Sequence, residues 1–142
     1  MTQEEINALL GTFEERKAQK LAAVDHQRAS LLAAGYSHDF GGGYGVKVLQ
    51  TRNTTDQIAW LTSQAAYSAA VASGQGAVLG ATFRPEDNST VVVTYAEGLA
   101  ALLGMAAWGA AIYQNSWALK DAIAGAADQA VLDAIDIETG WP

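Results

Sequence analysis

The feature that most constrains this chain is a stretch of 22 residues near its C-terminus, Gly98 to Leu119, that contains no charged side chain. Thr94 and Glu97 precede it at the spacing of a helical capping box. We therefore expect one long helix from Tyr95 to about Ala124, roughly 45 Å long. The stretch is also long enough to span a bilayer. Because no basic residues flank it directionally, we interpret it as a buried helix of a soluble domain.

Composition narrows the classes of function. The chain has 142 residues, of which 50% are hydrophobic, enough for one domain with its own core. Its net charge of −7 argues against a nucleic-acid or anionic-membrane partner. It has no cysteine, which removes disulfides, thiolate metal sites and cysteine nucleophiles. We expect no nucleic-acid partner, no membrane partner and no cofactor.

The N-terminal part, residues 2–34, reads as one helix. Thr2 and Glu5 have capping-box spacing, and Gly35 is a typical residue at a helix end. Its apolar stripe is narrow, which is typical of helices that self-associate or lie on a partner; packing on its own domain is the alternative left open. The residues predicted to oligomerise or dock are Ile6, Leu10, Phe13, Val24 and Leu31.

The remainder, residues 35–142, alternates β-hairpins and helices. A glycine turn separates residues 36–40 from 44–51, and a second hairpin joins Val78–Phe83 to Ser89–Thr94. Thr54 and Gln57 have the spacing to cap a helix between the hairpins, and Asp128 can cap a short last one. The predicted fold class is α+β. An N-terminal helix and two β-hairpins forming a small antiparallel sheet pack against a capped helix and the long C-terminal helix. The predicted domains are a docking helix, 1–34, and a compact domain, 35–142.

Aromatic side chains surround the first glycine turn. Tyr36, Phe40 and Tyr44 are a candidate ligand surface, of the kind a carbohydrate would use. Packing within the hairpin or the core is the competing explanation.

Catalytic patterns are missing from the sequence. It contains no His-Glu-x-x-His, Gly-x-Ser-x-Gly or Asp-x-Asp pattern. His26 directly follows Asp25, which is not a ligand spacing on a helix, and His38 with Asp39 leaves a metal site as a minor alternative. We therefore predict that the protein is not an enzyme and has no catalytic, cofactor or metal residues.

The C-terminal sequence carries a family resemblance. The relevant residues are Thr94, the helix opening near Leu99, the segment Tyr113 to Lys120 with Ser-Trp-Ala-Leu-Lys, the residues Asp121 to Ile123, the segment Ala134 to Ile137 and the final Gly140, Trp141 and Pro142. With these residues the chain resembles a domain of unknown function found in tail-fibre and tail-associated proteins of tailed bacteriophages. The match covers roughly residues 14 to 142 and is strongest after residue 82.

This resemblance implies a structural component of a bacteriophage virion. The expected role is a tail, baseplate or fibre-attachment protein that contacts other phage tail proteins. We expect a homo-oligomer, with a trimer favoured by tail symmetry, located in the virion and in the host cytoplasm during assembly. The alternatives are a tail-fibre assembly chaperone absent from the mature particle and a carbohydrate-binding receptor-recognition module. The family brings no catalytic residues to carry over.

Overall fold

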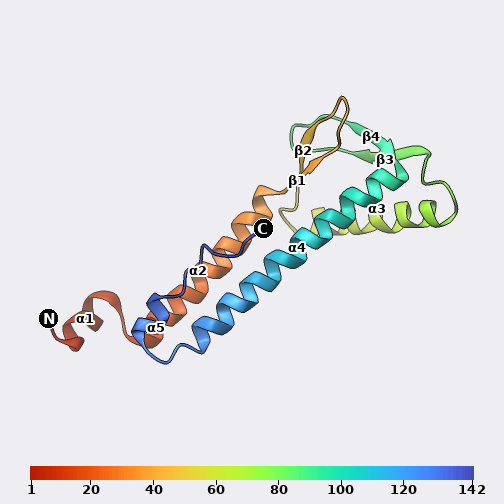
Figure 1. The fold of residues 1–142 in the computed structure, drawn as a ribbon. Coiled ribbons are helices and arrows are strands. Elements are labelled where there is room, and N and C mark those ends of the chain that lie inside the picture. Colours follow the sequence, from red (N-terminus) through yellow and green to blue (C-terminus); the bar gives the residue numbers. More distant parts are fainter. The chain divides into compact units, whose positions relative to one another are not determined.

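The computed structural model describes residues 1–142 as five helices and four strands (Figure 1). The helices are α1 (Gln3–Leu10), α2 (Phe13–Ala34), α3 (Thr54–Ala72), α4 (Tyr95–Ala124) and α5 (Gln129–Asp133). The strands are β1 (Tyr36–Asp39), β2 (Val46–Leu49), β3 (Leu79–Phe83) and β4 (Val91–Thr94). The predicted α+β class is therefore confirmed.

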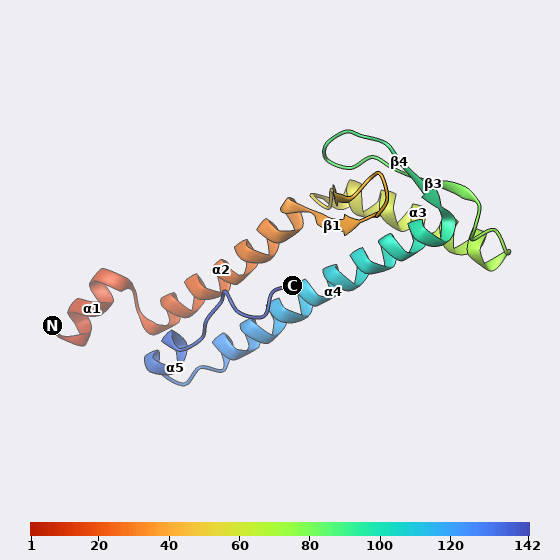
Figure 2. The same ribbon diagram turned by 45° about the horizontal axis from the view of Figure 1, so that its top comes forward.

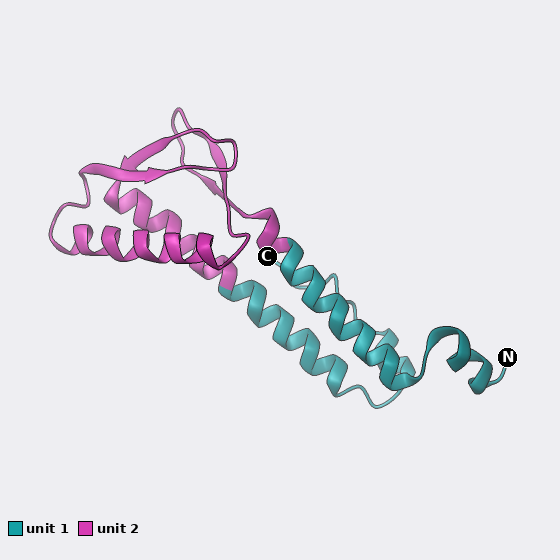
Figure 3. Cartoon of the chain, turned by 180° about the vertical axis from the view of Figure 1, so that it is seen from behind, with its two compact units in different colours: residues 1–30, 110–142 teal, residues 31–109 magenta.

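The contacts divide the chain into two compact units. Unit 1 comprises residues 1–30 and 110–142, and unit 2 comprises residues 31–109 (Figure 3). This division does not coincide with the predicted boundary between residues 34 and 35. Most of α2 belongs to the same unit as the C-terminal residues, so it is part of a compact body and not a separate docking helix.

The N-terminal residues form two helices where the sequence predicted one. Thr2 and Glu5 form the expected capping box of α1. The helix ends at Gly11, whose φ of 89° lies in the region that glycine adopts without a Cβ penalty. Thr12 and Glu15 then exchange a second pair of capping hydrogen bonds, of 3.2 and 3.0 Å, at the start of α2. A helix end followed at once by a new N-cap explains the break.

Unit 1 is held together by α2, the C-terminal half of α4, and α5. The two long helices run side by side in this unit (Figure 1 and Figure 2). Its buried cluster contains Val24, Ile123, Ala126 and Leu132. Trp141 packs against this cluster and donates a 2.7 Å hydrogen bond to the carbonyl of Ile137. Trp141 is therefore docked on unit 1.

Two lysines of α2 satisfy carbonyl groups at helix ends. Lys17 Nζ donates to the carbonyls of Ala124 and Ala126, at 2.9 and 3.4 Å, and Lys20 Nζ donates to that of Leu132 at 2.6 Å. The last carbonyls of a helix lack partners within the helix and carry its negative dipole end, so a cation stabilises them. Lys17 and Lys20 therefore contact the C-terminal segment and do not simply point into solvent.

Unit 2 contains both hairpins, and they remain separate. Strands β1 and β2 pair antiparallel with Tyr36 opposite Leu49, and β3 and β4 pair antiparallel with Phe83 opposite Val91. The structure therefore has two sheets of two strands, where the sequence predicted one sheet. One backbone hydrogen bond of 2.9 Å, from Glu86 N–H to the carbonyl of Val48, joins the two hairpins, and no continuous ladder connects them.

The core of unit 2 lies between α3, the second hairpin and the first half of α4. Its buried members include Leu49, Tyr67, Phe83, Val91 and Leu102. Gly98 allows α4 to approach the sheet closely, because a Cβ on it would lie 2.4 Å from the Cβ of Ala81. The glycine thus replaces a side chain at the contact between helix and strand.

Helix α4 is buried along one side only. Its 30 residues match the prediction in length, but only 28% of its apolar stretch is buried, so α4 is mostly exposed where a buried helix was expected. By length and composition it is the one helix in the structure that meets the requirements of a membrane span, a test that core helices of soluble proteins also pass. The large apolar side chains on its exposed side are Leu103, Tyr113 and Trp117.

Candidate functional site

Among the predicted docking residues, those on α1 are the most exposed. Helix α1 has no buried residue, Leu9 is 71% exposed and Leu10 59%, and Ile6 on the same side is half-buried. The contacts of α1 with α2 are polar: Arg16 donates to the carbonyl of Gly11 and to the side chain of Asn7. An amphipathic helix with an unfilled apolar side is suited to docking in a partner's groove.

The other predicted docking residues lie differently. Val24 is 0% exposed in the core of unit 1, so its assignment to a docking surface is corrected. Phe13 packs against the same core, and Lys17 lies over its ring at 5.1 Å. Leu31 is half-buried at the end of α2 in unit 2. The structure therefore separates this set into α1 residues at the surface and α2 residues that mostly support the fold.

The aromatic residues of the first hairpin are used in packing. Tyr36 contacts Trp108 with ring centroids 5.5 Å apart, and Phe40 contacts Phe83 at 5.2 Å. The hydroxyl of Tyr44 donates to the carbonyl of Val92 and accepts from its N–H, both at 3.2 Å. These contacts favour the packing explanation and leave Tyr44, 39% exposed, as the most accessible ring for a ligand.

A polar cluster joins α2 to α4 within unit 1. Asp25 accepts a 2.9 Å hydrogen bond from Lys120 and forms an ion pair with Arg28 at 3.3 Å. The bond from Lys120 lowers the pKa of Asp25 from its usual value, with the charge of Arg28 adding to the effect. Arg28 also donates to the fully buried Ser116 at 3.5 Å. This cluster could not be predicted from the sequence, because its members are up to 95 residues apart.

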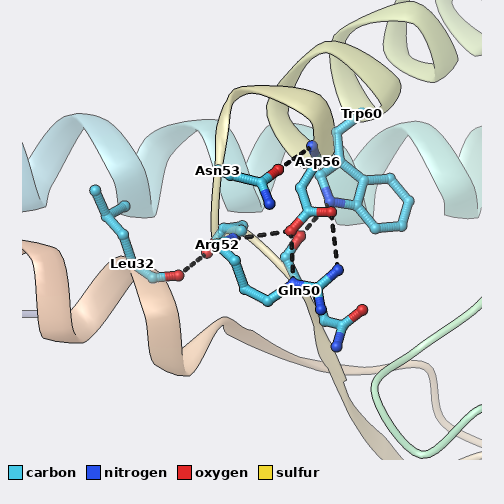
Figure 4. Close-up of polar contacts among 7 residues, drawn as sticks. Leu32, Gln50, Arg52, Asn53, Asp56 and Trp60 are labelled. Atoms are coloured by element: carbon cyan, nitrogen blue, oxygen red, sulfur yellow. Dashed lines mark hydrogen bonds and ion pairs between the residues drawn. The ribbon is translucent and has the colours of Figure 1, made fainter.

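A second polar cluster fixes the entry to α3 in unit 2 (Figure 4). The N-cap is Asn53, which accepts a 3.0 Å bond from the N–H of Asp56, and not the predicted Thr54 with Gln57. Arg52 hydrogen-bonds to the carboxylate of Asp56 and lowers its pKa. Trp60 donates to the carbonyl of Gln50 at 2.7 Å.

The same segment is tied to the end of α2. Thr51, which is buried, donates a 2.5 Å hydrogen bond to the carbonyl of Leu32 (Figure 4). Lys47 of β2 pairs at 2.7 Å with Asp87, in the turn of the second hairpin. This bond, together with those from Ser89, holds the pKa of Asp87 well below its usual range. Each polar cluster thus connects two neighbouring segments of the chain and stabilises the fold there.

We next considered the possible metal ligands of the chain, His38 among them. No group of three or more His, Asp or Glu side chains is placed to hold a metal ion. His38 instead contacts Phe40, with ring centroids 4.7 Å apart. Large apolar side chains are exposed on α1 and α4, and also on α3 at Ile58 and Leu61.

Comparison with known proteins identifies a family and no named relative. Neither the curated proteins nor the solved structures give a match to this chain. A family model described as a domain of unknown function, DUF4376, matches residues 15–139, which run from the first turn of α2 to beyond α5. The chain therefore belongs to the DUF4376 family.

Proposed function

We propose that this chain is a structural, protein-binding component of a bacteriophage tail, placed at a baseplate or fibre-attachment point. The observation that supports a protein-binding role is the unpartnered apolar side of α1, with Leu9 and Leu10 exposed on a helix that has no buried residue. The tail context comes from the resemblance of the C-terminal residues to domains of tail-associated proteins.

In this proposal α1 is the docking element and the family domain is its support. The family match begins at residue 15, after the break at Gly11, and therefore does not cover the first helix. Its docking side, Ile6, Leu9 and Leu10, would fill an apolar groove on a neighbouring tail protein. Its first turn carries Glu4 and Glu5, which interact favourably with the positive end of the helix dipole.

Shortening the chain tests the docking role, provided that the cut respects the core. Removing residues 1–30 would take away Val24 and unfold unit 1, so the informative deletion covers residues 2–10 and leaves the capping bonds of Thr12 and Glu15 in place. We expect this variant to be folded and to be lost from purified phage particles, measured by quantitative mass spectrometry. Incorporation at the wild-type level contradicts the docking role.

Point variants provide a matched comparison. Leu9→Gln and Leu10→Gln change the apolar side of α1, whereas Ala8→Gln places the same side chain on its opposite, exposed side. We expect the leucine variants to reduce incorporation and Ala8→Gln to leave it unchanged. Equal loss in all three indicates damage to α1 itself rather than to a docking surface.

The assembly chaperone is the alternative that the same experiment separates. A chaperone would be abundant in infected cells and absent from the finished particle. Co-expression with a tail fibre would then show improved fibre folding, whereas a fibre that folds equally well without this protein excludes that role.

A further inference from the structure

Both edges of the second hairpin in unit 2 are closed by tyrosine hydroxyls. Thr82 of β3 and Val92 of β4 lie opposite one another in the ladder. The hydroxyl of Tyr67 accepts a hydrogen bond from the N–H of Thr82 and donates one to its carbonyl, both at 3.3 Å. The hydroxyl of Tyr44 does the same for Val92, both at 3.2 Å. Thr82 and Val92 therefore turn these groups outward, as every second pair of an antiparallel ladder does, and each tyrosine takes the place of a third strand.

The two tyrosines differ in their exposure to solvent. Tyr67 belongs to α3, is 8% exposed and is part of the core of unit 2. Tyr44 belongs to the turn of the first hairpin, where its N–H donates a 3.2 Å hydrogen bond to the carbonyl of Gly41, and it is 39% exposed. The edge of β3 is thus covered by the core, whereas the edge of β4 is closed by one side chain at the surface.

The sequence of β4 favours pairing with an identical strand. Residues 89–95, Ser-Thr-Val-Val-Val-Thr-Tyr, contain no charge, glycine or proline, and most of them are β-branched. Segments of this length and composition pair with copies of themselves when their edge is open. Thr90, two residues before Val92, is exposed and turns its backbone to the same edge. At the other end of β4, the N–H of Thr94 is already bonded to Glu97 at 2.9 Å.

We infer that the outer edge of β4 is a strand-pairing surface for a second copy of the chain, and that the Tyr44 hydroxyl keeps it closed. When Tyr44 withdraws, the β4 strands of two copies pair antiparallel about a two-fold axis at Val91. Val92 then lies opposite the partner's Thr90 and exchanges both backbone hydrogen bonds with it. The axis creates a second, identical pair, so the contact is isologous. The β-branched side chains of each pair lie side by side and stabilise it.

The charges near this edge are compatible with such pairing. The nearest charged residues along the chain are Asp87 and Glu97. Asp87 is bonded to Lys47 at 2.7 Å, and Glu97 exchanges capping hydrogen bonds with Thr94. The paired segments themselves carry no charge, so two copies can approach without burying an unpaired one.

The first experiment is sedimentation equilibrium of the full chain over a range of concentrations. Tyr44→Phe removes the hydroxyl and keeps the ring, so the closed edge loses two hydrogen bonds. We expect the association constant to rise at least about tenfold above that of the wild type. Tyr67→Phe is the matched control, because it removes the same atom at the edge that the core covers; it should lower stability without raising association. No increase for Tyr44→Phe, or an equal increase in both variants while circular dichroism shows them folded, overturns the inference.

Two measurements in the Tyr44→Phe variant identify the edge that pairs. Adding Val92→Pro removes the outward N–H and leaves the ladder to β3 in place, so association should return to the wild-type level. Hydrogen exchange of the Val92 amide should be faster than in the wild type at low concentration and slow again as the concentration rises. A dimer that persists with Val92→Pro, or that leaves the Val92 amide unprotected, contradicts pairing at β4. The inference does not depend on the phage context or on α1, so its failure is distinct from failure of the tail proposal.

Discussion

Replacing Val24 with alanine distinguishes a core residue from a docking residue. The side chain is 0% exposed and packs with Ile123, Ala126 and Leu132. Removing two buried methyl-sized groups costs about 1.6 kcal/mol in transfer free energy. The cavity left in a packed core adds to this, so we expect the free energy of unfolding to fall by about 2–3 kcal/mol.

The assay is urea denaturation followed by circular dichroism, with hydrogen exchange of the Ile123 and Leu132 amides to report on unit 1. Leu10→Ala is the matched control, because its side chain is 59% exposed and belongs to neither core. We expect this control to change the free energy of unfolding by less than about 0.5 kcal/mol. If Val24→Ala leaves stability unchanged but reduces association with a partner, the assignment of Val24 to the core is refuted.

Three further predictions concern stability. Gly98→Ala should lower the melting temperature, because the new Cβ would collide with Ala81 at a cost of about 1–3 kcal/mol. Gly109→Ala should raise the melting temperature, because no atom lies within 4 Å of the new Cβ and alanine favours the helix. Lys17→Met should lower the free energy of unfolding in urea by about 1 kcal/mol, because it removes the donor to the last carbonyl of α4, at Ala124, and to that of Ala126. The pKa of Asp25 is lowered in the folded state, so its stabilising contribution is present above its usual value of 3.8 and is lost as the pH falls through the folded value. The difference in urea midpoint between wild type and Asp25→Asn should therefore shrink on acidification, and a constant difference contradicts the ion pair.

Local signals in the sequence predicted the helices well. The capping pairs of Thr2 with Glu5 and Thr94 with Glu97 are both present, and Asp128 caps α5 as expected. These predictions succeed because a cap involves residues three positions apart. The break at Gly11 was also predictable, since Thr12 and Glu15 have the same spacing.

Long-range contacts could not be predicted from the sequence. Val24 has the same appearance in the apolar stripe as Leu10, and only the packing of α5 and α4 on α2 separates their roles. The hydrogen bonds of Lys17 join residues more than 100 positions apart, so the sequence alone shows only a charged residue on the surface of a helix. The sequence of α4 has no distinct apolar side. Which of its residues are buried therefore depends on the segments that pack against it.

Quantitative mass spectrometry of purified phage particles tests the central proposal most directly. The signal of this protein would be scaled to a tail protein of known copy number, in wild type and in the variant lacking residues 2–10. The proposal predicts a stoichiometric signal in wild-type particles and its loss in the variant. Absence from wild-type particles, with the protein abundant in the infected lysate, contradicts a structural tail role.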